Sequence, residues 1–102
     1  MARDESFKDY VLDQLHELPG VTARGMFGGF GLYAGTIFFG IVSGGRVYFK
    51  TTEATRPAYE ERGMQPFRPT ETQTLKRYYE VPAEVVEDAE LLVEWAEGAL
   101  DE

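Results

Sequence analysis

Nine of the eleven glycines fall between Gly20 and Gly45, among aromatic and β-branched residues, and this stretch constrains the fold more than any other. Glycine at this density opposes helix formation, whereas short runs rich in Phe, Tyr, Ile and Val favour strands. The pairs Ala34-Gly35 and Gly44-Gly45 separate apolar runs at the short spacing of hairpin turns, where glycine tolerates a positive φ. The stretch therefore predicts an antiparallel meander, with strands near residues 22–27, 29–34, 37–43 and 46–50.

A helix is predicted before this sheet, because apolar residues recur there at spacings of three and four. Its expected buried stripe consists of Phe7, Tyr10, Val11, Leu15 and Leu18. We expect Ser6 and Asp9 to cap its start, and Leu18-Pro19-Gly20 to end it.

A short second helix is predicted after the meander. It is expected to begin at Thr52 or Thr55 and to end at Gly63, with Pro57 in its first turn. Residues 64–74 then predict a surface loop, since prolines and polar turn-forming residues are frequent there.

The C-terminal part predicts one more strand and one more helix. A brief extended piece is considered at residues 65–68, and residues 75–81 alternate well enough for a fifth strand. Pro82 suits the first position of a helix that runs almost to the C-terminus. Its expected buried stripe consists of Val85, Ala89, Leu92, Ala96 and Leu100.

The length of 102 residues corresponds to one domain, so residues 1–102 are expected to form a single unit. With 43% apolar residues the chain can bury a sizeable core, which excludes intrinsic disorder. The predicted fold class is α+β, an antiparallel sheet of about five strands with helices packed mainly on one face. The predicted element order is α-β-β-β-β-α-β-α.

Composition limits the function classes. Eighteen acidic against ten basic side chains give a formal charge of -8, which repels a polyanionic backbone and disfavours broad nucleic-acid affinity, but not a local basic patch. The chain contains no cysteine, which excludes disulfides, thiolate nucleophiles and Cys-ligated metals. The N-terminus is charged and resembles no signal peptide, and no long apolar run follows, so we expect no membrane contact and a cytoplasmic location.

Charge is distributed unevenly along the chain. Residues 1–23 carry a net charge of -3, residues 24–77 carry +4, and residues 78–102 carry -9. If the terminal helices cover one face of the sheet, the helical side is acidic and the sheet side mildly basic. The alternative is that the acidic residues merely form solvated helix faces.

The motifs with catalytic or ligand-binding potential have weak support. The run from Gly29 to Ala34 matches G-x-G-x-x-A, but a dinucleotide site needs a helix after it, and here a strand is predicted. His16 is the single histidine and lies off the apolar stripe. The acidic residues Glu87, Glu90, Glu94 and Glu97 share one polar helix face and are expected to be solvated. We therefore expect no catalytic residue, no metal site and no cofactor.

Leu91 and Trp95 widen the apolar face of the last helix beyond a simple packing stripe. The first explanation is that a strand edge or the first helix of the same chain covers them. The alternative is self-association or another partner, since aromatic anchors dominate interfaces. Leu91 and Trp95 are accordingly our candidate self-association residues.

Cations and aromatic rings are mixed on the predicted strands, as they are in platforms that bind single-stranded nucleic acid. These residues are Arg24, Arg46, Tyr48, Lys50, Lys76, Arg77, Tyr78 and Tyr79. Alternation along a strand sends half of them inward as core, and the overall charge opposes nucleic acid. Direct nucleic-acid binding stays as an alternative.

Several segments together resemble the N-terminal domain of the TfoX/Sxy family of bacterial competence regulators. They are Arg24-Gly25-Met26-Phe27-Gly28-Gly29-Phe30-Gly31-Leu32-Tyr33, Phe39-Gly40, Tyr48-Phe49-Lys50, Gly63-Met64-Gln65-Pro66-Phe67 and Tyr78-Tyr79-Glu80-Val81-Pro82. The resemblance continues into the acidic last helix and covers nearly the whole chain. It implies the same α+β fold as the pattern above.

The resemblance also implies a function. Full-length members act as transcriptional coactivators beside a cyclic-AMP receptor protein and carry a second, helical C-terminal domain. We expect this chain to be a stand-alone N-terminal domain, so the coactivator role transfers only as one alternative. The family supplies no catalytic residues to carry over.

Within the resembling core, Met26, Phe27, Gly28 and Gly29 are expected to be structural. The glycines would adopt backbone conformations closed to other residues, while Met26 and Phe27 pack. Arg24 and Lys50 are harder to explain by packing. With Tyr48 and Tyr78 they are our candidate partner-binding residues.

These observations lead to one functional prediction. The chain is expected to be a non-enzymatic regulatory module that acts through protein–protein contacts, with transcription machinery or a second copy as candidate partners. Direct nucleic-acid binding is the alternative, and a small enzyme is the third class.

Overall fold

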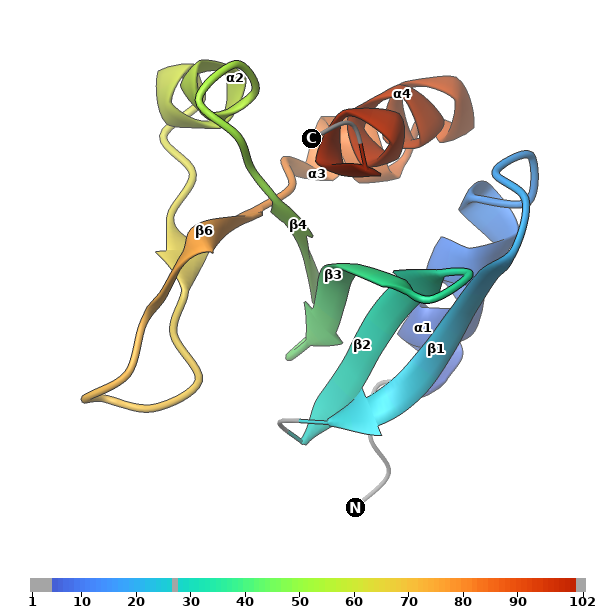
Figure 1. Cartoon of the computed structure of the whole chain (residues 1–102), viewed down its shortest axis with the longest axis horizontal. Coiled ribbons are helices and arrows are strands. Elements are labelled where there is room, and N and C mark those ends of the chain that lie inside the picture. The colour runs from blue at the N-terminus through green and yellow to red at the C-terminus, as the bar shows by residue number, and fades with distance from the viewer. Residues whose placement is uncertain (1–4, 27, 101–102) are drawn as a thin grey trace.

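The computed structural model describes residues 5–26 and 28–100, and within them it contains four helices and six strands (Figure 1). In chain order these are α1 (Glu5–Gln14), β1 (Val21–Met26), β2 (Gly29–Ala34), β3 (Ile37–Ser43), β4 (Arg46–Lys50), α2 (Arg56–Glu61), β5 (Pro66–Phe67), β6 (Leu75–Glu80), α3 (Ala83–Val86) and α4 (Ala89–Leu100). The predicted α+β class is confirmed.

All six strands form one antiparallel sheet in the order β1-β2-β3-β4-β6-β5. The predicted four-strand meander is present, and β6 extends it by pairing with β4. The brief extended piece considered at residues 65–68 pairs as the two-residue strand β5 and adds a sixth strand to the five predicted.

The N-terminal helix differs from its prediction in three respects. It ends at Gln14 and not at Leu18-Pro19-Gly20, because residues 15–18 continue as turns with i→i−3 hydrogen bonds. Ser6 lies inside α1, so the prediction that it caps the helix is wrong. Tyr10 is 40% exposed and does not belong to the buried stripe, whereas Val11 and Leu15 are buried. The helix packs through a narrower stripe than the sequence spacing indicated.

The single C-terminal helix predicted from Pro82 onward is wrong as well. The chain forms the four-residue helix α3 and then, after Glu87 and Asp88, the longer helix α4. Pro82 stands at the N-cap of α3, one position before the helix. Asp88 accepts a hydrogen bond from the backbone N–H of Leu91 at 3.2 Å, which starts α4 as a new helix.

The core lies between one face of the sheet and the helices. Helix α4 contacts β3, β4 and α1, and α1 contacts β1. The helices contribute Val11, Tyr59, Val85, Leu92, Ala96 and Ala99, the turn after α1 contributes Leu15, and the central strands contribute Phe30, Leu32, Phe39, Val42, Val47 and Phe49.

A β-bulge in β3 assigns side chains to the two faces of the sheet. Leu32 pairs with Gly40 whereas its neighbour Tyr33 pairs with Phe38, so Phe39 is the extra residue. Phe39 is buried in the core, and Phe38 lies beside Tyr33 on the opposite face. The bulge thus supplies an aromatic side chain to both faces.

Candidate partner-binding face

The strand register brings the four predicted partner-binding residues to one face. Lys50 pairs with Tyr78 across β4 and β6, and Tyr48 pairs with Glu80 two residues away. Directly paired residues in an antiparallel sheet project to the same side. Their neighbours Val47 and Phe49 lie in the core, so Tyr48 and Lys50 project away from the helices.

Arg24 reaches the same face from β1. Its guanidinium carbon lies 5.1 Å from the centre of the Tyr33 ring, a cation–π arrangement. Tyr33 lies 5.2 Å from Phe38, and Phe38 lies 5.4 Å from Tyr78, between ring centres. A continuous row of contacts therefore crosses the sheet from Arg24 to Tyr78.

We call this surface the outer face of the sheet. It consists of Arg24, Met26, Tyr33, Phe38, Ile41, Tyr48, Lys50, Phe67 and Tyr78. Arg24 is exposed, Ile41 and Phe67 are buried, and the other six are partly buried. Aromatic residues, Met and Arg are the residue types enriched in protein interfaces.

A second part of the outer face lies where β4, β5 and β6 meet. The rings of Tyr48 and Phe67 lie 4.6 Å apart, and Arg46 donates to both carboxylate oxygens of Glu80 at 3.0 and 2.9 Å. Burial raises the pKa of the Tyr48 phenol. The negative charge of Glu80 also raises this pKa, whereas the positive charge of Arg46 lowers it. The Tyr48 hydroxyl therefore stays a hydrogen-bond donor at neutral pH.

A depression of about 380 Å³ adjoins this corner. It is lined by Arg46, Tyr48, Gln65, Pro66, Arg68, Thr74 and Glu80. Its walls combine two guanidinium groups and a phenol with one carboxylate, which suits polar or acidic groups of a partner.

Sequence reasoning missed three rings of the outer face, Tyr33, Phe38 and Phe67. Tyr33 could have been found from its place across the first hairpin from Arg24. Phe38 could not, because the bulge that turns it outward has no clear sequence signal. Of the other residues considered, Tyr79 lies on the helical side, 6.0 Å from Tyr59 between ring centres.

The structure explains the glycine motif by two different mechanisms. Gly28 has a positive φ of 74°, as expected, but Gly29 does not. A Cβ on Gly29 would lie 2.1 Å from the backbone oxygen of Val42. Glycine is therefore required at this position because the two strands approach each other closely. Met26 packs over Gly31, where a Cβ would lie 2.6 Å from its methyl carbon. Phe27 lies outside the described residues.

Leu91 and Trp95 lie on α4, and Trp95 contacts α2 and its C-terminal end. The Trp95 ring meets Tyr59 edge-on, with 4.7 Å between ring centres, and the Arg62 guanidinium carbon lies 5.2 Å from its centre. The cover of Trp95 is thus α2, and not the strand edge or first helix considered from the sequence. Leu91 is exposed, and self-association through Leu91 and Trp95 stays a prediction.

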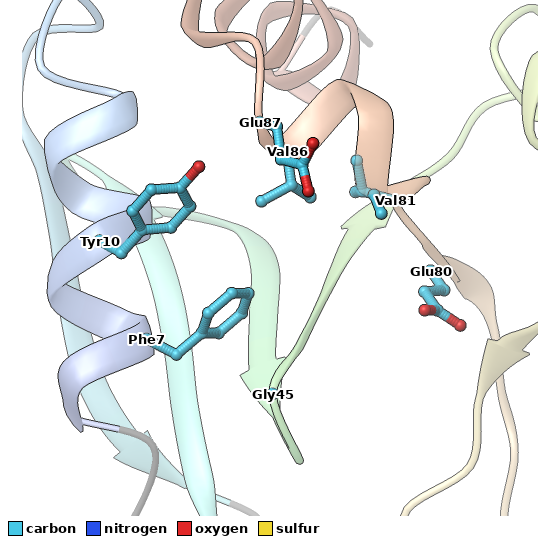
Figure 2. Close-up of a pocket in the computed structure, with 8 residues that line it drawn as sticks. Phe7, Tyr10, Gly45, Glu80, Val81, Val86 and Glu87 are labelled. Atoms are coloured by element: carbon cyan, nitrogen blue, oxygen red, sulfur yellow. The ribbon is translucent and has the colours of Figure 1, made fainter.

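A separate pocket of about 280 Å³ lies between α1, the β3–β4 turn and α3 (Figure 2). Phe7 and Tyr10 project from α1 into the space facing Val86, as Figure 2 shows, and the two rings stack 6.1 Å apart. Glu80 and Glu87 supply its carboxylates, and Glu80 is held by Arg46. Its walls are otherwise mainly apolar, which suits a small hydrophobic group better than proton transfer.

Residues 5–26 and 28–100 were the part of the chain considered for a metal site and for a membrane-spanning helix. No group of three His, Asp or Glu side chains there could hold a metal ion. Among the same residues, every helix is too short or too polar to cross a membrane.

Comparison with protein families gives a match over residues 13–102 to the TfoX N-terminal domain. The chain belongs to the TfoX N-terminal domain family. The match covers nearly the whole chain and confirms the resemblance found from the sequence motifs. Comparison with curated individual proteins gives no match. Membership of this family is consistent with a regulatory module.

Proposed function

We propose that this TfoX N-terminal domain is a non-enzymatic regulatory module that binds a protein partner through the outer face of its sheet, in the bacterial cytoplasm. The observation that carries the proposal is the unbroken row of contacts from Arg24 through Tyr33 and Phe38 to Tyr78. Partly buried rings supply apolar contact area at low entropic cost, and cations at the rim supply selectivity.

The partner chemistry follows from the charges on this face. Arg24 and Lys50 contribute positive charge, while the carboxylate of Glu80 is bound by Arg46. The preferred partner is a protein surface with carboxylates around an apolar centre. Transcription machinery is the candidate that family membership favours.

The test is quantitative co-purification from the native cytoplasm with tagged baits. Arg24→Glu and Lys50→Glu each reverse one charge on the outer face, and Arg56→Glu makes the same charge change on α2. The proposal predicts that both outer-face variants lose a partner that the wild type and Arg56→Glu retain. Equal recovery by all four baits contradicts it.

Direct nucleic-acid binding is the second candidate, because rings and cations share the outer face as they do in single-strand platforms. A gel-shift titration at several salt concentrations separates the two. Binding that weakens steeply with salt, and that is lost in Lys50→Glu, supports nucleic acid. Absence of binding at low salt contradicts nucleic-acid binding and leaves protein binding as the proposed function.

A further inference from the structure

The two edges of the sheet differ in how they are protected. The edge strand β5 has two residues, begins with Pro66, and pairs with β6 in a broken register. The opposite edge, β1, has six residues, all paired with β2 without a bulge, and it contains no proline and one charged residue, Arg24. Native sheets usually protect a long edge strand with proline, a bulge or several charged side chains, because the unpaired backbone groups of the edge can bind another strand.

The hydrogen-bond pattern identifies the outward-facing groups of β1. Gly35 donates its N–H to the carbonyl of Gly20 at 3.0 Å, at the open end of the first hairpin. Since bonded and non-bonded pairs alternate in an antiparallel ladder, residues 22, 24 and 26 bond to β2. Val21, Ala23 and Gly25 therefore direct their N–H and C=O groups outward. Within residues 5–26 and 28–100, no hydrogen bond occupies these outward groups.

We propose that β1 pairs antiparallel with β1 of a second copy of this chain, with the two-fold axis at Ala23. In this register Ala23 lies opposite its own copy and Val21 lies opposite Gly25. All the outward-facing residues then meet one another, and three bonded pairs give about six N–H···O bonds. Thr22 lies opposite Arg24 on the outer face.

The neighbouring registers are worse for identifiable reasons. A shift of one residue places outer-face side chains opposite core-face side chains. Centring the pair on Arg24 places two guanidinium groups directly opposite each other, which is unfavourable because like charges repel. Of these registers, the one centred on Ala23 pairs every outward-facing residue from Val21 to Gly25 without opposing like charges.

The second copy is preferred to an unrelated strand because, in this register, the outward N–H and C=O groups of β1 all bond to the same groups of the other copy. Pairing would join two outer faces into one surface, with an Arg24 and Tyr33 pair on each side of the axis. The opposing force is electrostatic, since each copy carries a charge of -8 and the exposed residues Asp9 and Asp13 lie on α1, next to β1. Raising salt should therefore strengthen the dimer.

The first test is light scattering of the intact chain up to millimolar concentration, from about 0.05 to about 1 M NaCl, where the Debye length falls to about 3 Å. The proposal predicts dimer mass that increases with salt. Ala23→Pro removes an outward N–H but no β1–β2 bond, so it should weaken the dimer about tenfold or more with an unchanged thermal transition. Trp95→Ala should keep the dimer.

Three results overturn the proposal: a wild-type monomer under all these conditions, an Ala23→Pro variant that dimerises like the wild type, or a dimer lost in Trp95→Ala while that variant is still folded. The last result would assign self-association to α4.

A cross-linking test keeps the proposal decidable if Ala23→Pro does not fold. Because the chain has no cysteine, single-cysteine variants give an unambiguous product. Mixed Thr22→Cys and Arg24→Cys chains should form a disulfide-linked heterodimer in higher yield than either variant alone. Equal yields, or cross-linking only between Arg24→Cys chains, contradict the register. Cross-linking to a different protein instead would assign the edge to another partner.

The dimer does not depend on the proposed function. Ala23→Pro leaves Arg24, Tyr48, Lys50 and Tyr78 in place, so co-purification of the partner and dimer mass are separate measurements. Either proposal can fail while the other stands.

Discussion

Gly29 is the first residue of β2, and its α-carbon lies close to the backbone of Val42 on β3. A methyl group there would collide with the backbone oxygen of Val42, which cannot move without breaking the β2–β3 register. Gly28, one residue earlier, has open space around it and is constrained only by its positive φ. Two adjacent glycines therefore have different physical roles.

The two alanine substitutions should differ in cost. Gly29→Ala is expected to lower the free energy of unfolding by about 3 kcal/mol or more, because backbone overlap adds to overpacking. Gly28→Ala should cost about 1 to 2 kcal/mol, the penalty of a left-handed conformation. Urea denaturation of both variants measures the difference. A Gly28→Ala variant less stable than Gly29→Ala would contradict this assignment.

Because of Tyr59, the free energy of unfolding should depend on pH in the alkaline range. Burial raises the pKa of its phenol above the ordinary value near 10, so the folded state keeps a proton that the unfolded state releases. This stabilisation is complete below about pH 10 and is lost as pH rises toward the folded-state pKa, by up to about 1.4 kcal/mol per pH unit. Denaturation at several pH values should show that the free energy of unfolding decreases less steeply above pH 10 in Tyr59→Phe than in the wild type. An identical slope in both proteins would show that Tyr59 does not carry the effect.

At the scale of elements, the break between α3 and α4 depends on one side chain. Asp88 accepts a hydrogen bond from Leu91 and stands before the first turn of α4. Asp88→Ala should cost about 1 kcal/mol, whereas Asp88→Asn keeps the acceptor and should cost much less. Thermal denaturation of the pair tests this. Equal losses would mean that the cap does not stabilise α4.

The contact between α2 and α4 depends on Trp95. Truncation to alanine removes the edge-on contact with Tyr59 and the Arg62 cation–π contact, and should cost about 2 to 3 kcal/mol because the ring is only partly buried. Leu91→Ala, on the same helix but exposed, is the matched control and should cost less than about 1 kcal/mol. Chemical denaturation measures both. If the two variants are equally stable, α2 is not held by Trp95.

Most elements could be predicted because their signals are local. Glycine and β-branched residues set the strand bounds to within one or two residues, and Pro57 and Gly63 framed α2. The helix break at Asp88 was missed because the apolar stripe of Val85, Ala89 and Leu92 continues across it in the sequence. An aspartate before an apolar run is a capping signal, but it competes there with an uninterrupted helical period.

At the scale of the whole molecule, the candidate surface was only partly predictable. Arg24 and Lys50 were selected because packing did not explain them, and the strand register places them on one face. The rings that connect them come from Tyr33 and Phe38, and the outward direction of Phe38 depends on a bulge that only the three-dimensional pairing reveals. The strand register decides which side chains share a face of the sheet, and patterns in a single sequence specify that register weakly.

The measurement that most directly tests the outer face as the recognition surface is NMR of the aromatic side chains during titration with the co-purified partner. Trp95, the single tryptophan, lies on the helical side and serves as an internal reference. We predict that the resonances of Tyr33, Phe38, Tyr48 and Tyr78 shift while the Trp95 indole does not. Shifts confined to Trp95 and its neighbours on α2 and α4 would contradict the account.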